Sequence, residues 1–94
     1  MKLRWLPEAV EDLDRIDQFW REIDAELARR SAAIILGLAE SLDQFPERGR
    51  ISRADPESRE LVGSFGAGAF ILRYRLIEGD ILVVQVRHSR ERQD

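Results

Sequence analysis

The last ten residues, QVRHSRERQD, gather the side chains of this 94-residue chain that are best suited to chemistry. His88, the only histidine, follows Arg87 and precedes Arg90 and Arg92. An imidazole acts as a general acid or base only when a reacting group lies within hydrogen-bond reach. Guanidinium groups bind carboxylates and phosphates through a planar fork. The ending therefore suggests a basic contact surface, with an acid–base site as the alternative.

Two strands predicted at 69–77 and 81–88 position these residues. A three-residue turn over 78–80 pairs Tyr74 with Val84 and Arg73 with Gln85. A shift of one residue would exchange the two faces of the strand, so the register with one apolar face is favoured. This register places an apolar set against the helices: Phe70, Leu72, Tyr74, Leu76, Leu82, Val84, Val86 and His88. We expect His88 to be a partly buried structural residue in this position.

The opposite face of the same strands carries three arginines, Arg73, Arg75 and Arg87. They alternate with apolar side chains and with Gln85, a mixture typical of protein interfaces. We interpret this electropositive face as a docking surface for carboxylates or phosphates on a large partner. The apolar members of the face are Ile71, Ile77, Ile81 and Val83.

The first half of the chain has helical periodicity. Pro7 and the acidic residues after it favour a helix over 7–23. Asp24 can cap a second helix that ends at Phe45, before Pro46. A strand at 2–5, a loop over 46–59 and a strand at 59–65 complete the order β-α-α-β-β-β. The chain is thus predicted to be one α+β domain over 1–94, with Trp5, Trp20 and Phe45 in its core.

Composition excludes several classes of site. The chain has no cysteine and one histidine, so neither a disulfide nor a zinc site is expected, and we predict no metal or cofactor. No signal peptide or membrane-length apolar run is evident, and we expect a cytoplasmic protein. The net charge of −3 disfavours direct nucleic-acid binding by the chain alone.

Several segments resemble, in order and spacing, the ParE/RelE toxin superfamily of bacterial type II toxin–antitoxin systems. They are LRWLPEAVEDLDRI, LAESLDQFPERG, RELVG, FILRYRL and VVQVRHSRERQ, and together they span nearly the whole chain. The first segment and the RHSR ending are more similar to ParE than to RelE. The resemblance implies a helical hairpin packed on one face of a small twisted antiparallel sheet. It also implies a cognate ParD-like antitoxin, whose C-terminal segment folds over the toxin.

The resemblance leaves two activities open. ParE proteins inhibit DNA gyrase, whereas RelE proteins are ribosome-dependent messenger RNA endoribonucleases. Lys2 is the only lysine, the C-terminal segment has no tyrosine, and the chain is acidic, which favours a gyrase inhibitor acting by binding. A ribonuclease, or a diverged toxin that retains only antitoxin binding, remains the alternative. The target-binding residues implied are Arg73, Arg75, Arg87, His88, Arg90 and Arg92.

Apolar side chains outside the predicted helix stripes suggest where the antitoxin binds. Leftover apolar surface suits a partner that folds on binding. The expected antitoxin-binding residues are Phe19, Ala32, Ala33 and Leu36, with Arg73 and Arg75 pairing with carboxylates of the antitoxin.

Overall fold

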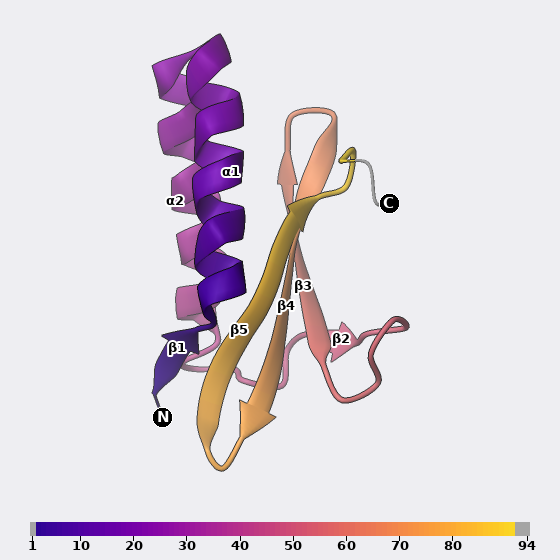
Figure 1. Cartoon of the computed structure of the whole chain (residues 1–94). Helices are drawn as coiled ribbons and strands as arrows, with labels where there is room; N and C mark the ends of the chain where they lie inside the picture. Colours follow the sequence, from indigo (N-terminus) through magenta and orange to yellow (C-terminus); the bar gives the residue numbers. More distant parts are fainter. Residues whose placement is uncertain (1, 92–94) are drawn as a thin grey trace.

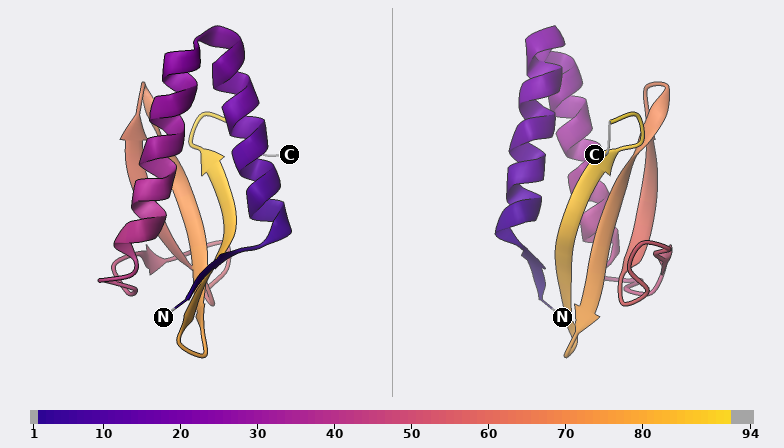
Figure 2. Two further views of the ribbon diagram at one scale, coloured as in Figure 1. Left: turned by 90° about the vertical axis from the view of Figure 1, so that its left-hand side faces the viewer. Right: turned by 45° about the vertical axis from the view of Figure 1, so that its right-hand side comes forward.

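The structure, a computed structural model, describes residues 2–91. Two antiparallel helices cover one face of a five-stranded sheet (Figure 1), and the hairpin of β4 and β5 extends beyond the helices at one end (Figure 2). The elements are β1 (Leu3–Trp5), α1 (Pro7–Ile23), α2 (Ala25–Ser41), β2 (Arg50–Ile51), β3 (Arg59–Phe65), β4 (Gly68–Ile77) and β5 (Asp80–His88).

The starts of both helices follow the sequence signals. Pro7 is the first residue of α1, where its missing N–H costs no hydrogen bond. The Asp24 side chain accepts a hydrogen bond from the Glu26 N–H at 2.8 Å and caps α2. The fold is α+β as predicted, and none of the helices within residues 2–91 is both long and apolar enough to cross a membrane.

The predicted end of the second helix is wrong. α2 ends at Ser41, and the backbone N–H groups of Leu42 and Asp43 bond three residues back instead of four. These tighter turns take the chain out of the α-helical phase. Leu42 is still buried, but Phe45 is 63% exposed and is not a core residue. Trp5 and Trp20 do pack against the core.

The sheet is mixed, not antiparallel. Its strand order is β1-β5-β4-β3-β2, and β1 runs parallel to β5 while the other neighbours are antiparallel. β1 joins the edge of β5 through bonds from Ile81 N to Lys2 O at 2.7 Å and from Leu6 N to Val83 O at 2.9 Å. The two-residue strand β2 lies in the segment predicted to be a loop.

The β4–β5 turn has two residues, not three. Ile77 pairs with Asp80, and Glu78 and Gly79 both have positive φ, 50° and 83°. Turns of this kind match the right-handed twist of a hairpin. The shorter turn shifts the pairing by one residue, so Tyr74 pairs with Val83 and not with the predicted Val84. A β-bulge between Tyr74 and Arg73 then restores the predicted register, in which Arg73 pairs with Gln85.

The bulge corrects the predicted faces of β5. Val84 is the extra residue, so Ile81 and Val83 face the helices and are buried. Leu82 and Val84 line the opposite face. Beyond the bulge, Val86 and His88 are buried as predicted. Leu76 was expected in the core but is exposed, since it lies near the hairpin end that extends beyond the helices (Figure 2).

Tyr74 joins the sheet to the segment after α2. Its side chain is fully buried, as predicted, and its hydroxyl donates to the Pro46 carbonyl at 2.8 Å. The same oxygen accepts from the Gly49 N–H at 3.0 Å. Burial raises the pKa of the Tyr74 hydroxyl above its usual value. The chain leaving α2 is thereby directed to β2 at the edge of the sheet.

Candidate functional site

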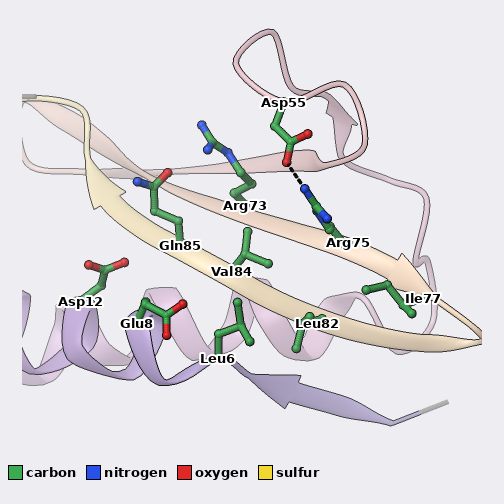
Figure 3. Close-up of a pocket in the computed structure, with 10 residues that line it drawn as sticks. All are labelled: Leu6, Glu8, Asp12, Asp55, Arg73, Arg75, Ile77, Leu82, Val84 and Gln85. Atoms are coloured by element: carbon green, nitrogen blue, oxygen red, sulfur yellow. Dashed lines mark hydrogen bonds and ion pairs between the residues drawn. The ribbon is translucent and has the colours of Figure 1, made fainter.

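The outer face is the side of the sheet that points away from the helices. As the alternation predicts, it carries Arg73 and Arg75 from β4 and Gln85 and Arg87 from β5. Figure 3 shows that the loop over 52–58 folds back over this face and brings Asp55 to Arg75. Two of the three arginines are therefore placed beside carboxylates of the same chain.

The predicted positive charge of the outer face is largely neutralised. Arg73 pairs with Glu60 at 3.2 Å, and the two side chains are only 19% and 12% exposed. Arg75 pairs with Asp55 at 2.7 Å and with Glu57 at 3.5 Å. The expectation of an electropositive face is wrong at these two positions, because β3 and the 52–58 loop supply the opposite charges.

Arg87 differs from the other two arginines. It lies opposite Ile71 on β4, whose other neighbour is Val62 on β3. No ion pair joins Arg87 to another residue of the described range 2–91. Arg87 is thus the arginine of the outer face that keeps a guanidinium for a partner.

The 52–58 loop is shaped by its own polar groups. The Ser52 N–H donates to the Ser58 carbonyl at 2.9 Å, and the Ser58 N–H donates to the Asp55 carbonyl at 2.8 Å. Asp55 also accepts from the Ser58 hydroxyl at 2.8 Å. The hydrogen bond from Arg75, followed by that from Ser58, lowers the pKa of Asp55 from 3.8 to about 2. Asp55 is therefore an anion throughout the physiological pH range.

A cavity of about 530 Å³ lies between this loop, the outer face and the start of α1 (Figure 3). The side chains of Arg73, Arg75 and Gln85 form one wall, and Glu8 and Asp12 stand on the opposite side. Leu6, Ile77, Leu82 and Val84 supply its apolar surface. Within residues 2–91, no cluster of three or more histidine, cysteine or acidic side chains could hold a metal ion.

His88 lies at the other end of β5 and is 8% exposed. The Arg90 N–H donates to Nδ1 at 3.3 Å, so Nδ1 carries no proton. Nε2 lies 3.1 Å from the Phe65 carbonyl oxygen and therefore carries the proton and donates it. Both ring nitrogens are thus engaged by backbone groups of the same chain.

The surroundings of His88 are apolar and tight. Its ring packs edge-on against Trp20 and Phe70, with centroid distances of 6.0 Å and 5.1 Å. A Cβ on Gly68 would come within 2.7 Å of the His88 ring. These contacts agree with the predicted structural role, and they leave His88 little surface for a target.

A second cavity, of about 510 Å³, opens beside His88. Ile16, Phe19 and Trp20 of α1 form its apolar side together with Ala67 of the β3–β4 turn. Arg15, Arg90 and Glu91 add charged groups to its lining. Arg15 is paired with Asp12 and Glu91, whereas the Arg90 side chain bonds only the Ala67 carbonyl among the described residues.

The sequence interpretation missed the side chains that cover the free edge of β5. β1 ends opposite Val83, and beyond it the Val86 N–H donates to Asp12 at 3.0 Å. The His88 N–H donates to Glu91 at 2.9 Å. Such contacts protect an edge strand from pairing with other chains. No local pattern in the sequence distinguishes Asp12 from the other acids of α1.

The expected antitoxin-binding residues fall on separate surfaces. Phe19 is 58% exposed and lines the cavity beside His88. Ala33 and Leu36 are exposed on α2, and Ala32 is half-buried, but they line neither cavity. Arg92, an expected target-binding residue, lies outside the residues that the structure describes.

Comparisons with known proteins agree on one group. A family described as the ParE toxin of type II toxin–antitoxin systems, parDE, matches residues 3–93. Toxin RelE3 of Caulobacter vibrioides is 35% identical over 86 residues, covering 92% of this chain and 91% of the relative. Toxin RelE1 of the same organism is 31% identical over 83 residues, covering 88% and 87%.

A solved structure has the same fold. The chromosomal ParDE TA system from P. aeruginosa contains a chain that superposes with a TM-score of 0.78. The match covers 94% of this chain and 95% of the other, at 24% sequence identity.

Proposed function

Because the chain belongs to the family of ParE toxins of type II toxin–antitoxin systems, we propose that it inhibits DNA gyrase and is neutralised by a ParD-like antitoxin. Inhibition occurs by binding and involves no chemical step on a substrate. The cytoplasm, where gyrase acts, is its proposed site of action.

The burial and the hydrogen bonds of His88 are the observations that support this proposal. A general acid or base must exchange a proton with a reacting group within hydrogen-bond reach. His88 is buried, and its two nitrogens are bonded to Arg90 N and to Phe65 O. Arg73 and Arg75 are paired with carboxylates, so the outer face offers little net charge to a messenger RNA. A surface of this kind is better suited to binding a protein than to cleaving a polyanion.

The proposed target contacts follow the basic end of the chain. Arg87 and Arg90 have no carboxylate partner among residues 2–91, and Arg92 follows them in the sequence. Each can form a charged hydrogen bond with an acidic group of gyrase. Arg73 and Arg75 contribute only where the target displaces their present partners. His88 supports the strand from which Arg87 extends.

The antitoxin is proposed to bind at two places. An apolar side chain of its C-terminal segment fits the cavity lined by Phe19 and Trp20, where the Arg90 guanidinium can pair with an adjacent carboxylate. Ala32, Ala33 and Leu36 on α2 provide a second apolar contact. Carboxylates of the same segment are proposed to reach Arg73 and Arg75.

A ribosome-dependent messenger RNA endoribonuclease is the second candidate. Two relatives that are 35% and 31% identical to this chain carry the name RelE. Their similarity spans most of the chain, so family membership alone does not distinguish a gyrase inhibitor from a ribonuclease. A toxin that has lost activity and only binds antitoxin is the third possibility.

Parallel assays with one preparation of the purified toxin distinguish the three. We expect inhibition of supercoiling by gyrase, and no cleavage of messenger RNA on translating ribosomes. Antitoxin added beforehand should prevent the inhibition. Codon-phased cleavage on ribosomes with unchanged supercoiling would instead establish the ribonuclease, and inactivity in both assays with tight antitoxin binding would identify a diverged toxin.

A further inference from the structure

The outer face brings together the hydrogen-bond donors of a phosphate-binding site, but carboxylates of the same chain pair with its arginines. Arg73 and Arg75 lie on the same side of β4 and in one wall of the 530 Å³ cavity. Gln85, opposite Arg73, adds an amide that can donate to an anion. Without the acids, two guanidinium forks and an amide would border one open space (Figure 3).

Three carboxylates reach these arginines from one stretch of chain. Glu60 accepts from both Nε and Nη2 of Arg73, at 3.3 Å and 3.2 Å. Asp55 accepts from Arg75 at 2.7 Å, and Glu57 lies 3.5 Å from its other terminal nitrogen. The acids thus occupy the donors that a phosphate would use.

We infer that Asp55, Glu57 and Glu60 are specificity-determining residues, which mask Arg73 and Arg75 and keep the outer face from binding single-stranded nucleic acid. The inference goes beyond the proposed function, because it concerns which ligands the outer face rejects and not which target the toxin inhibits. The ligand class excluded is a phosphodiester strand, whose affinity for proteins depends on uncompensated arginine and lysine.

The three acids differ in how firmly they are held beside the arginines. Glu60 is part of β3 and also accepts from the Ser52 hydroxyl at 3.0 Å, so its pair with Arg73 is built into the sheet. Asp55 and Glu57 lie on the 52–58 loop, and Glu57 is largely exposed. Removing the loop charges should therefore unmask Arg75 without disturbing the sheet.

The test is the affinity of the purified toxin for a fluorescent 20-nucleotide single-stranded RNA, measured by anisotropy. The unmasking variant is Asp55→Asn/Glu57→Gln/Glu60→Gln. The matched control is Glu11→Gln/Asp14→Asn/Glu22→Gln, which changes three exposed acids of α1. Both variants bring the formal net charge from −3 to 0, so only the position of the lost charges differs.

We expect the unmasking variant to bind the RNA about a hundredfold more tightly than the control, because each of the two unmasked arginines gains a charged hydrogen bond worth about tenfold or more. Its log–log salt dependence should be steeper by about 1.4, or about 0.7 for each of two new phosphate contacts. Adding Arg73→Gln/Arg75→Gln to the unmasking variant should abolish the gain.

Equal affinities of the unmasking and control variants would overturn the inference. So would tight RNA binding by the wild-type protein, or a gain that survives the loss of both arginines. Because Glu60 is nearly buried, thermal melting accompanies each measurement. If the triple variant does not fold, Asp55→Asn/Glu57→Gln decides the matter, compared with Glu11→Gln/Asp14→Asn. Its expected gain is about tenfold for the single unmasked arginine, and no gain refutes the masking.

Discussion

At the scale of single residues, His88 shows how surroundings decide the role of a reactive side chain. His88→Gln can retain a donor toward Phe65 but loses the acceptor for the Arg90 N–H and the ring contacts with Trp20 and Phe70. We expect a loss of about 1–3 kcal/mol in the free energy of unfolding, or roughly 4–8 °C in melting temperature for each kcal/mol. Growth arrest should persist at temperatures where the variant is folded.

Arg90→Ala provides the complementary control for His88→Gln. It keeps the backbone N–H that bonds His88 but removes a guanidinium from the proposed target surface. It should reduce toxicity in a graded manner and leave the melting temperature almost unchanged. A His88→Gln protein that is fully folded yet completely non-toxic would contradict the binding account and favour proton transfer.

The ion pair between Asp55 and Arg75 predicts how the stability of the fold depends on pH. Its pKa is about 2 in the folded protein against 3.8 ordinarily, chiefly because Arg75 donates to it. A lowered pKa means that the ionised group stabilises the fold fully above pH ~4, and that this contribution is lost as the pH falls through about 2. Melting temperatures of wild type and Asp55→Asn should therefore differ at pH 7 and converge toward pH 2. The pH-dependent difference should be much smaller in an Arg75→Gln background, and its persistence there would exclude the ion pair as the cause.

At the scale of elements, periodicity predicted more of the helices than of the sheet. The bounds 7–23 of α1 follow from Pro7 and the apolar spacing, and the structure has the same bounds. The bulge in β5 could not be predicted, because Ile81 to Val84 are all apolar and either register would bury a suitable side chain. The parallel edge strand β1 depends on contacts distant in sequence, which local patterns do not contain.

The prediction of the candidate site was limited in the same way, because local patterns locate the strand residues but not their partners from loops. Alternation along β4 places Arg73 and Arg75 on the outer face, as the structure does. Their partners Asp55 and Glu57 come from a loop, and no periodicity indicates where a loop folds. The predicted charge of the face was wrong for that reason, although the positions of its arginines were right.

The β4–β5 turn offers a test of the two-residue assignment. Glu78 has a φ of 50°, a left-handed conformation that asparagine adopts more readily than glutamate. Glu78→Asn creates an Asn-Gly turn and should raise the free energy of unfolding by about 0.5–1 kcal/mol. Chemical denaturation measures the change. Glu47→Asn, the same change at an exposed turn residue whose φ is not positive, serves as control. A destabilised Glu78→Asn protein would argue against the turn.

The helical hairpin is the element proposed to bind the antitoxin. Phe19→Ala removes a wall of the cavity beside His88, and Leu36→Asp places a charge on the exposed side of α2. Each should weaken antitoxin binding by about 2 kcal/mol, or about thirtyfold. Phe45→Ala is the matched control, because Phe45 is equally exposed but lies outside the proposed interface. Calorimetric titration gives the dissociation constants, and an unchanged value for either variant removes its surface from the interface.

At the scale of the whole molecule, charge and architecture are consistent with an inhibitor of a protein. The net charge is −3, and acids lie on α1 as well as on the loop that covers the outer face. Such a chain gains little from long-range attraction to nucleic acid. Within residues 2–91, Arg87 at the end of β5 and Arg90 in the turn after it form no ion pair, so their guanidinium groups remain available to a partner.

The stoichiometry of gyrase inhibition tests the account most directly. Purified toxin is titrated against gyrase at a concentration well above the dissociation constant, and supercoiling is measured at each step. An inhibitor that acts by binding should reduce activity in proportion to the toxin added, reach full inhibition near equivalence, and be reversed by antitoxin. Unchanged supercoiling at a large excess of folded toxin, or complete inhibition by a small fraction of an equivalent, would contradict inhibition by binding.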